Sequence, residues 1–173
     1  MSLNIDPLSF IKVGVDQEQD LELKEASRNQ TAKRAAQILM EEDSGFVVPT
    51  SEQKKILLVE FARNNKVLYG KAFDIIKIHQ GTIIDLSSPT SVRDSVDKIT
   101  ICEIKSTNRR NIKPDFKRYF FGLTTAELLV AQNLRSQYKF VFVNIATRDI
   151  LELTLTDVFS KATNIYPQWS ISF

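Results

Sequence analysis

The spacing of apolar residues changes once along this chain, and that change limits the folds open to it. Up to Asn64, apolar residues recur every three or four positions, as on one face of a helix. From Ala72 onwards, short runs rich in Ile, Val and Phe follow the two-residue period of a β-strand. Helical spacing followed by strand spacing predicts an α/β (α+β) fold with a central mixed sheet flanked by helices.

Caps and turn residues set the boundaries of the predicted elements. Helices are expected over residues 27–43, 50–64, 124–135 and 156–162, with Thr50 or Ser51 and Thr124 or Thr125 as N-caps. Strands are expected over residues 72–79 and 82–86, which form a hairpin, and over 98–106, 119–122, 138–146, 150–153 and 169–173. Residues 87–97 are expected to form a polar loop.

A chain of 173 residues, 43% of them hydrophobic, predicts a single domain with its own core. Residues 1–26 are expected to form an arm or short first element, 27–146 the core and 147–173 a C-terminal extension. One cysteine and one histidine exclude a Cys/His zinc site and a disulfide framework. Five scattered glycines exclude a P-loop and a dinucleotide-binding fingerprint.

The charge is small but unevenly distributed. The formal net charge is +2, the segment 14–25 is acidic, and five bases fall within residues 109–118. The sequence shows no signal peptide and no apolar run long enough for a membrane helix, so a cytoplasmic protein without a membrane partner is expected. The bases are Arg109, Arg110, Lys113, Lys117 and Arg118.

Two predicted strands each carry an acid among apolar residues. Alternation places Glu103 and Lys105 on one face of their strand, and pairing would bring Asp74 to the same place. Burying these charges is costly, and a bound cation would remove that cost. Mg²⁺ prefers such oxygen ligands, so Asp74, Glu103 and the backbone carbonyl of Ile104 are candidate metal ligands. The ammonium of Lys105 could orient an attacking water for phosphodiester cleavage.

The alternative is that these charges only form surface ion pairs. Asp74 would then pair with Lys71 or Lys77, and Glu103 with Lys105. An acid followed two residues later by a lysine occurs four times in this chain, but only the occurrence at Glu103 lies in an apolar strand. That context favours a functional site over a solvated pair.

The spacing of Asp74 from Glu103-Ile104-Lys105, with 28 residues between the acids, resembles the PD-(D/E)xK nuclease superfamily. The resemblance covers roughly residues 30–146 and implies a restriction endonuclease-like αβββαβ core. It also implies a DNA endonuclease of restriction or repair type, with Asp74 and Glu103 as Mg²⁺ or Mn²⁺ ligands and Lys105 serving the nucleophilic water. The chain departs from the family pattern at Phe73, where a proline often stands.

Other parts of the prediction follow from that resemblance. Glu60, on the helix before the first acid, is a candidate additional metal ligand, with an ion pair to Arg63 as the alternative. The bases of residues 109–118 directly follow the Glu103 strand and are candidates for binding DNA phosphates. A homodimer is expected by analogy with restriction enzymes, whose twofold symmetry matches twofold DNA sites.

Two other functions remain open at this level. One is a non-catalytic nucleic-acid or protein interaction module that retains the nuclease fold, which the small net charge favours. The other is an RNA or nucleotide phosphodiesterase with the same site. Nothing in the sequence distinguishes a protein that recognises the 2′-hydroxyl of RNA from one that binds DNA.

Overall fold

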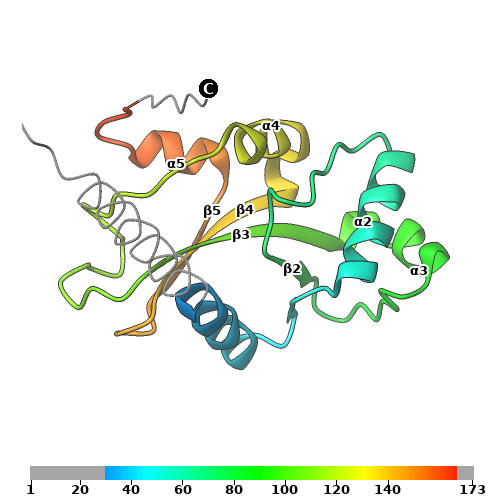
Figure 1. Ribbon diagram of the computed structural model, residues 1–173, viewed down its shortest axis with the longest axis horizontal. Helices are drawn as coiled ribbons and strands as arrows, with labels where there is room; N and C mark the ends of the chain where they lie inside the picture. Colours follow the sequence, from blue (N-terminus) through cyan, green and yellow to red (C-terminus); the bar gives the residue numbers. More distant parts are fainter. Residues whose placement is uncertain (1–29, 167–173) are drawn as a thin grey trace, which may run out of the picture.

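The structure is a computed structural model that describes residues 30–166 of the chain (Figure 1). It begins with a helix over residues 30–42. The strands are β1 (Phe46–Val47), β2 (Ile75–Ile78), β3 (Ile99–Thr107), β4 (Tyr138–Asn144) and β5 (Ile150–Leu153). The later helices are α2 (Ser51–Arg63), α3 (Pro89–Asp94), α4 (Thr125–Leu134) and α5 (Leu155–Lys161), and short 3-10 helices precede β3 (Val96–Lys98) and β4 (Arg135–Gln137).

The strands form one mixed sheet in the order β1-β2-β3-β4-β5. β3 and β4 are parallel, whereas every other neighbouring pair is antiparallel. β3 lies in the middle and spans nine residues, several of them β-branched, which suits a strand covered on both faces. The predicted mixed sheet flanked by helices is therefore confirmed.

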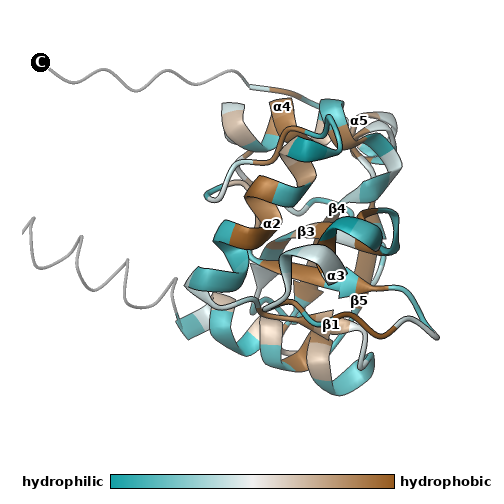
Figure 2. Cartoon of the chain, turned by 90° about the vertical axis from the view of Figure 1, so that its right-hand side faces the viewer, coloured by the Kyte–Doolittle hydropathy of each residue, from teal (hydrophilic) through white to brown (hydrophobic). Residues whose placement is uncertain are grey.

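Each face of the sheet carries its own apolar cluster. Ile101 and Phe140 belong to the cluster that includes buried residues of α2, α3, α4 and α5. On the other face, Cys102 and Ile104 pack in a cluster with the helix over residues 30–42. Figure 1 shows that helix, in blue, on the side of the strands away from α4 and α5, and Figure 2 shows hydrophobic colour on the strands and on parts of α2 and α4. The alternation expected for β3 is thus present.

Local capping signals explain where the two long helices begin. The side chain of Thr50 caps α2 and that of Thr124 caps α4, each in a reciprocal capping box with the residue three positions later. The helices then bury Leu57 and Phe61 of α2 and Val130 of α4 against the sheet. Both helices match their predicted positions closely.

The predicted hairpin of residues 72–79 with 82–86 is wrong. β2 is already bonded to β1 on one side and to β3 on the other, so residues 82–86 have no free edge of it to pair with. The chain does turn near Gly81, whose φ of +76° suits glycine, but it continues as an irregular loop. The partners of β2 are therefore β1 and β3, and not the segment 82–86 that directly follows it.

Two further predictions are corrected. The predicted polar loop over 87–97 contains α3, because Ser88 caps it and Pro89 occupies its first position. The predicted strand over 119–122 is irregular, since Tyr119 and Phe121 pack their rings on Phe142 instead of joining the sheet. The predicted arm over 1–26 and the strand over 169–173 lie outside the described residues.

Candidate active site

Asp74 lies directly before β2, where the ladder between β2 and β3 ends. Its backbone N–H donates to the carbonyl of Cys102 at 3.0 Å, and its carboxylate Oδ2 accepts from the backbone N–H of Ile104 at 3.0 Å. The preceding residue, Phe73, is buried, and its carbonyl accepts from Nζ of Lys54 at 3.0 Å. These bonds hold an exposed carboxylate against the backbone of β3.

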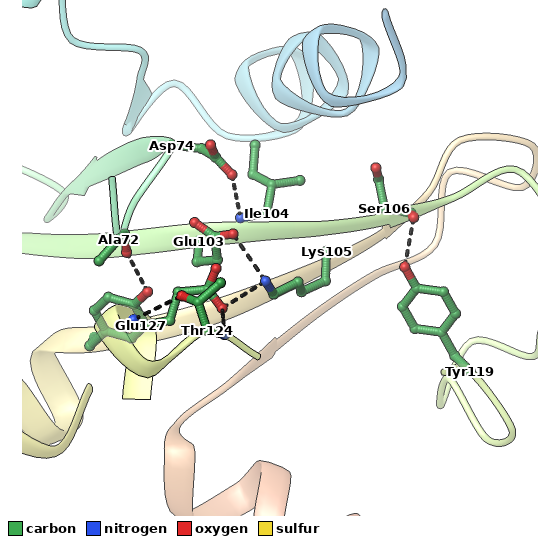
Figure 3. A network of polar contacts seen from close by, with 10 residues as sticks. Ala72, Asp74, Glu103, Ile104, Lys105, Ser106, Tyr119, Thr124 and Glu127 are labelled. Atoms are coloured by element: carbon green, nitrogen blue, oxygen red, sulfur yellow. Dashed lines mark hydrogen bonds and ion pairs between the residues drawn. The ribbon is translucent and has the colours of Figure 1, made fainter. Parts of the chain in front are cut away.

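Glu103 and Lys105 point from the same face of β3 into a small ionic cluster. Nζ of Lys105 lies 3.0 Å from Oε1 of Glu103 and 2.8 Å from Oε2 of Glu127 on α4. Figure 3 shows the ammonium between the two carboxylates, with Asp74 on the other side of the β3 ribbon's edge from Lys105. The structure therefore joins Glu103 and Lys105 in one cluster with a further acid, Glu127, and places Asp74 beside the same strand, close enough for its charge to act on Glu103.

Burial dominates the electrostatics of this cluster. It raises the pKa of the Glu103 carboxyl to about 8, and the charges of Asp74 and Glu127 add to the effect while Lys105 opposes it. For Lys105, burial alone would lower the pKa, but Glu103 and Glu127 outweigh it and raise the pKa above its usual value. Lys105 is therefore an ammonium at neutral pH, and two acids, Glu103 and Glu127, contact this cation.

Glu127 is the functional candidate that the sequence reasoning missed. It is only 4% exposed, and it also closes the capping box of α4, where Thr124 N–H donates to its Oε2 at 3.2 Å. The Thr-x-x-Glu pattern at 124–127 is visible in the sequence, but it predicts a helix start and not a partner for Lys105. Only the packing of α4 on β3 brings the two side chains together.

Glu60 occupies a different place. Its side chain is 1% exposed and accepts from Nε of Arg93 at 2.7 Å and from Nη1 of Arg63 at 2.9 Å. Arg93 first, and Arg63 with it, lower the pKa of this carboxyl despite its burial. Glu60 thus joins α2 to α3, and its ion pairs do not include Asp74 or Lys105.

The surface pairings considered from the sequence are only partly present. Lys77 contacts Asp43 and Glu152 at 3.1 and 2.7 Å, and its pairs do not include Asp74. The pair of Glu103 with Lys105 does form, but both side chains are largely buried. A mere surface pairing therefore does not describe this cluster.

The five bases of residues 109–118 lie on an exposed loop that follows β3. Within the part of the chain that the structure describes, none of them forms an ion pair. The loop is nevertheless fastened to the core, because Ile112 and Phe116 are buried in the apolar cluster under α4. Its positive charge is thus presented to solvent at the end of the strand that carries Glu103 and Lys105.

The carboxylates of the candidate site determine what kind of divalent cation could bind there. Among residues 30–166, no group of three or more His, Cys, Asp or Glu side chains is placed to hold a metal ion. Two carboxylates from adjoining strands, Asp74 and Glu103, are present, and Mg²⁺ commonly takes one or two carboxylates with water and substrate oxygens. The residues therefore fit a partly hydrated Mg²⁺ and do not fit an all-protein cage.

No protein-family model, curated protein or solved structure matches this chain. In the described residues, no helix has the length and apolar character needed to cross a membrane.

Proposed function

We propose that this chain is a metal-dependent endonuclease of the PD-(D/E)xK type, of restriction or repair class, that hydrolyses DNA phosphodiester bonds. The observation that carries the proposal is the convergence of Asp74, Glu103 and Lys105 where β2 leaves β3. The strand arrangement supports it: β1, β2 and β3 are successively antiparallel, and β4 follows α4 and runs parallel to β3. The order of these four strands in the sheet is the one expected of an αβββαβ core, although α2 and α3 interrupt the three consecutive strands along the chain.

The backbone of β3 offers a third candidate oxygen ligand, the carbonyl of Ile104. In an extended strand, the N–H and C=O of one residue point to the same side. The N–H of Ile104 points to the carboxylate of Asp74, so the carbonyl of Ile104 faces that side too. The carbonyl of Ile104 lies beyond Ile75–Cys102, the last residue pair between β2 and β3, so no residue of β2 is paired with Ile104. Asp74, Glu103 and this carbonyl would hold Mg²⁺ or Mn²⁺.

The role of Lys105 follows from its charge. Because its pKa is raised, Lys105 is not a base that accepts a proton from water. Its ammonium can instead hold an attacking water by hydrogen bonding and stabilise negative charge that develops on it. The metal, when bound, would act as a Lewis acid and lower the pKa of bound water. Glu127 positions Lys105 by accepting one of its hydrogen bonds.

The test is cleavage of supercoiled plasmid DNA with Mg²⁺ or Mn²⁺ by the wild type and by Asp74→Asn. The amide keeps an oxygen for the bond to Ile104 N–H, so we expect a folded but inactive protein. Asp85→Asn is the matched control, because Asp85 is also exposed and accepts a bond from a backbone N–H, that of Ser87 at 2.9 Å. Equal cutting by all three proteins would reject the proposal.

Lys105 needs a double variant. Lys105→Met alone leaves Glu103 and Glu127 facing each other, and breaking a buried ion pair in this way costs about 3–5 kcal/mol. Lys105→Met with Glu127→Gln removes one of those charges, so the double variant should regain part of the lost stability while staying inactive. Cutting at the wild-type rate by the folded double variant would show that Lys105 has no part in the reaction.

An interaction module that keeps the fold without turnover is the second candidate. The observation that favours it is that the ammonium of Lys105 is already bonded to both Glu103 and Glu127, which leaves it less free to hold a water molecule. Calorimetric titration with Mn²⁺ separates the two, because an interaction module has no need to bind the ion at Asp74 and Glu103. Light scattering at several protein concentrations tests the predicted homodimer.

A further inference from the structure

The loop over residues 108–123 is fixed in place although it contains no helix or strand. The side chain of Asn144 on β4 donates to the carbonyl of Arg109 at 3.0 Å. Further along, the hydroxyl of Tyr119 donates to the carbonyl of Ser106 at 2.6 Å (Figure 3). Ser106 directly follows Lys105, so the second half of the loop is fastened beside the candidate active site.

Phe120 is the large apolar side chain that this loop holds in water. Its two neighbours are anchored: the rings of Tyr119 and Phe121 stack at 6.0 Å, and Phe121 meets Phe142 edge-on at 4.9 Å. Phe120 itself is 77% exposed. Because both neighbours are held by the core, Phe120 cannot fold inwards without displacing them, and its ring stays available on the surface.

The charge around Phe120 indicates what the ring meets. Lys117 and Arg118 lie three and two residues before it, and Arg118 is held at a φ of +67°, which residues other than glycine rarely adopt. Like the other bases of the loop, neither forms an ion pair within residues 30–166. An exposed aromatic ring near lysine and arginine side chains that form no ion pair within residues 30–166 suits a ligand that is a polyanion and also presents flat apolar faces. Single-stranded nucleic acid is such a ligand.

Ile83 shows that exposure alone does not lead to this conclusion. It is 98% exposed, yet it lies in the loop after β2 with no lysine or arginine within three residues on either side. A lone exposed apolar residue of that kind is ordinary. It therefore serves as the control for Phe120 and not as a second site.

We propose that Phe120 stacks on an unpaired base of the DNA substrate, while Lys117 and Arg118 hold the neighbouring phosphates. This inference rests on the proposed nuclease function and narrows its substrate to DNA with an unpaired base near the scissile bond, such as a flap, a mismatch or a frayed end. A fully paired duplex offers no free base face to the ring, so Phe120 contributes little to binding it.

The experiment measures binding of the full chain in EDTA, so that no cleavage occurs. The probes are a single-stranded oligonucleotide carrying 2-aminopurine and a blunt duplex of the same sequence. We expect Phe120→Ala to weaken single-strand binding about tenfold and to abolish the stacking-induced quenching of 2-aminopurine. Phe120→Trp should restore both, and Ile83→Ala should change neither. Duplex binding should be the same for all variants.

Salt dependence separates the ring from the charges. The slope of log Kd against log salt should be unchanged in Phe120→Ala, whereas Lys117→Ala should reduce it by about 0.7 for a single strand. Wild-type affinity of Phe120→Ala for the single strand, or an equal loss on the duplex, would overturn the inference.

The two proposals fail separately. If the wild type cuts DNA and Phe120→Ala binds single strands normally, the stacking role is wrong and the nuclease stands. If the wild type binds single strands through Phe120 but never cuts with Mg²⁺ or Mn²⁺, the nuclease assignment is wrong and the binding site stands.

Discussion

Replacing Glu103 with glutamine should stabilise the metal-free protein, and the gain should grow with pH. Glutamine keeps the shape of a protonated glutamate but cannot ionise. In the folded chain, burial first, with Asp74 and Glu127, raises the pKa of Glu103 from 4.5 to about 8. The unfolded chain therefore releases this proton near pH 4.5 and the folded chain only near pH 8. Between these values the folded state binds more protons, so its stability falls as pH rises.

The size of the effect follows from the same pKa. The ceiling is about 5 kcal/mol once both states are fully ionised, and about 3 kcal/mol develops between about pH 5.5 and pH 8.5. Lys105 does not contribute to this change in stability, because its pKa is raised and the ammonium loses its proton only above this pH range. Glu103→Gln lacks this loss, so the difference in stability between the two proteins should widen by about 3 kcal/mol.

Urea unfolding in EDTA at the two pH values measures that difference, which should appear as a midpoint separation that widens by about 1 M. Taking the difference cancels every other titrating group. Glu52→Gln is the control, since Glu52 is exposed and pairs with Lys55, which is exposed too. A separation that stays constant with pH would refute the claim that Glu103 is held neutral by its surroundings. Adding Mg²⁺ at the higher pH should stabilise the wild type and not Glu103→Gln.

Two further substitutions test the local structure around the site. Gly45→Ala should destabilise the chain by about 1–3 kcal/mol, because a Cβ there would lie 2.6 Å from the backbone carbonyl of Ile78. Gly122→Ala should be neutral or slightly stabilising, since a Cβ there meets nothing within 4 Å; comparable losses in thermal unfolding of both variants would contradict this. Thr124→Ala should cost about 1 kcal/mol by removing the cap of α4, measured by urea unfolding, and Thr154→Ala on α5 gives the same loss without touching Glu127. If only Thr124→Ala also lowers the rate of plasmid cutting, α4 positions Glu127 for Lys105.

Local signals carried most of what the sequence predicted correctly. Thr50 and Thr124 mark the starts of α2 and α4, and each acts within four residues of itself. Alternation along one strand was enough to place Glu103 and Lys105 on the same face, because the pleat alone decides this.

The errors arose where distant segments compete. Residues 82–86 have a strand-like pattern, but β1 and β3 already occupy both sides of β2. Glu127 is likewise invisible as a partner of Lys105, since no local spacing relates α4 to β3. The aromatic pattern of residues 119–122 predicts a strand, whereas the hydroxyl of Tyr119 instead bonds to the backbone carbonyl of Ser106 and anchors a loop. Tertiary packing decides each of these cases.

Because β3 is the central strand, the positions of Glu103 and Lys105 are as stable as the sheet itself. Its backbone is bonded to β2 on one side and β4 on the other, so we expect the amide hydrogens of this strand to be among the last to exchange. Their mutual spacing can change only if the sheet itself opens. Under the proposed function, adaptation to differently shaped substrates would come from peripheral loops, where residues can change without disturbing the sheet that holds Glu103 and Lys105.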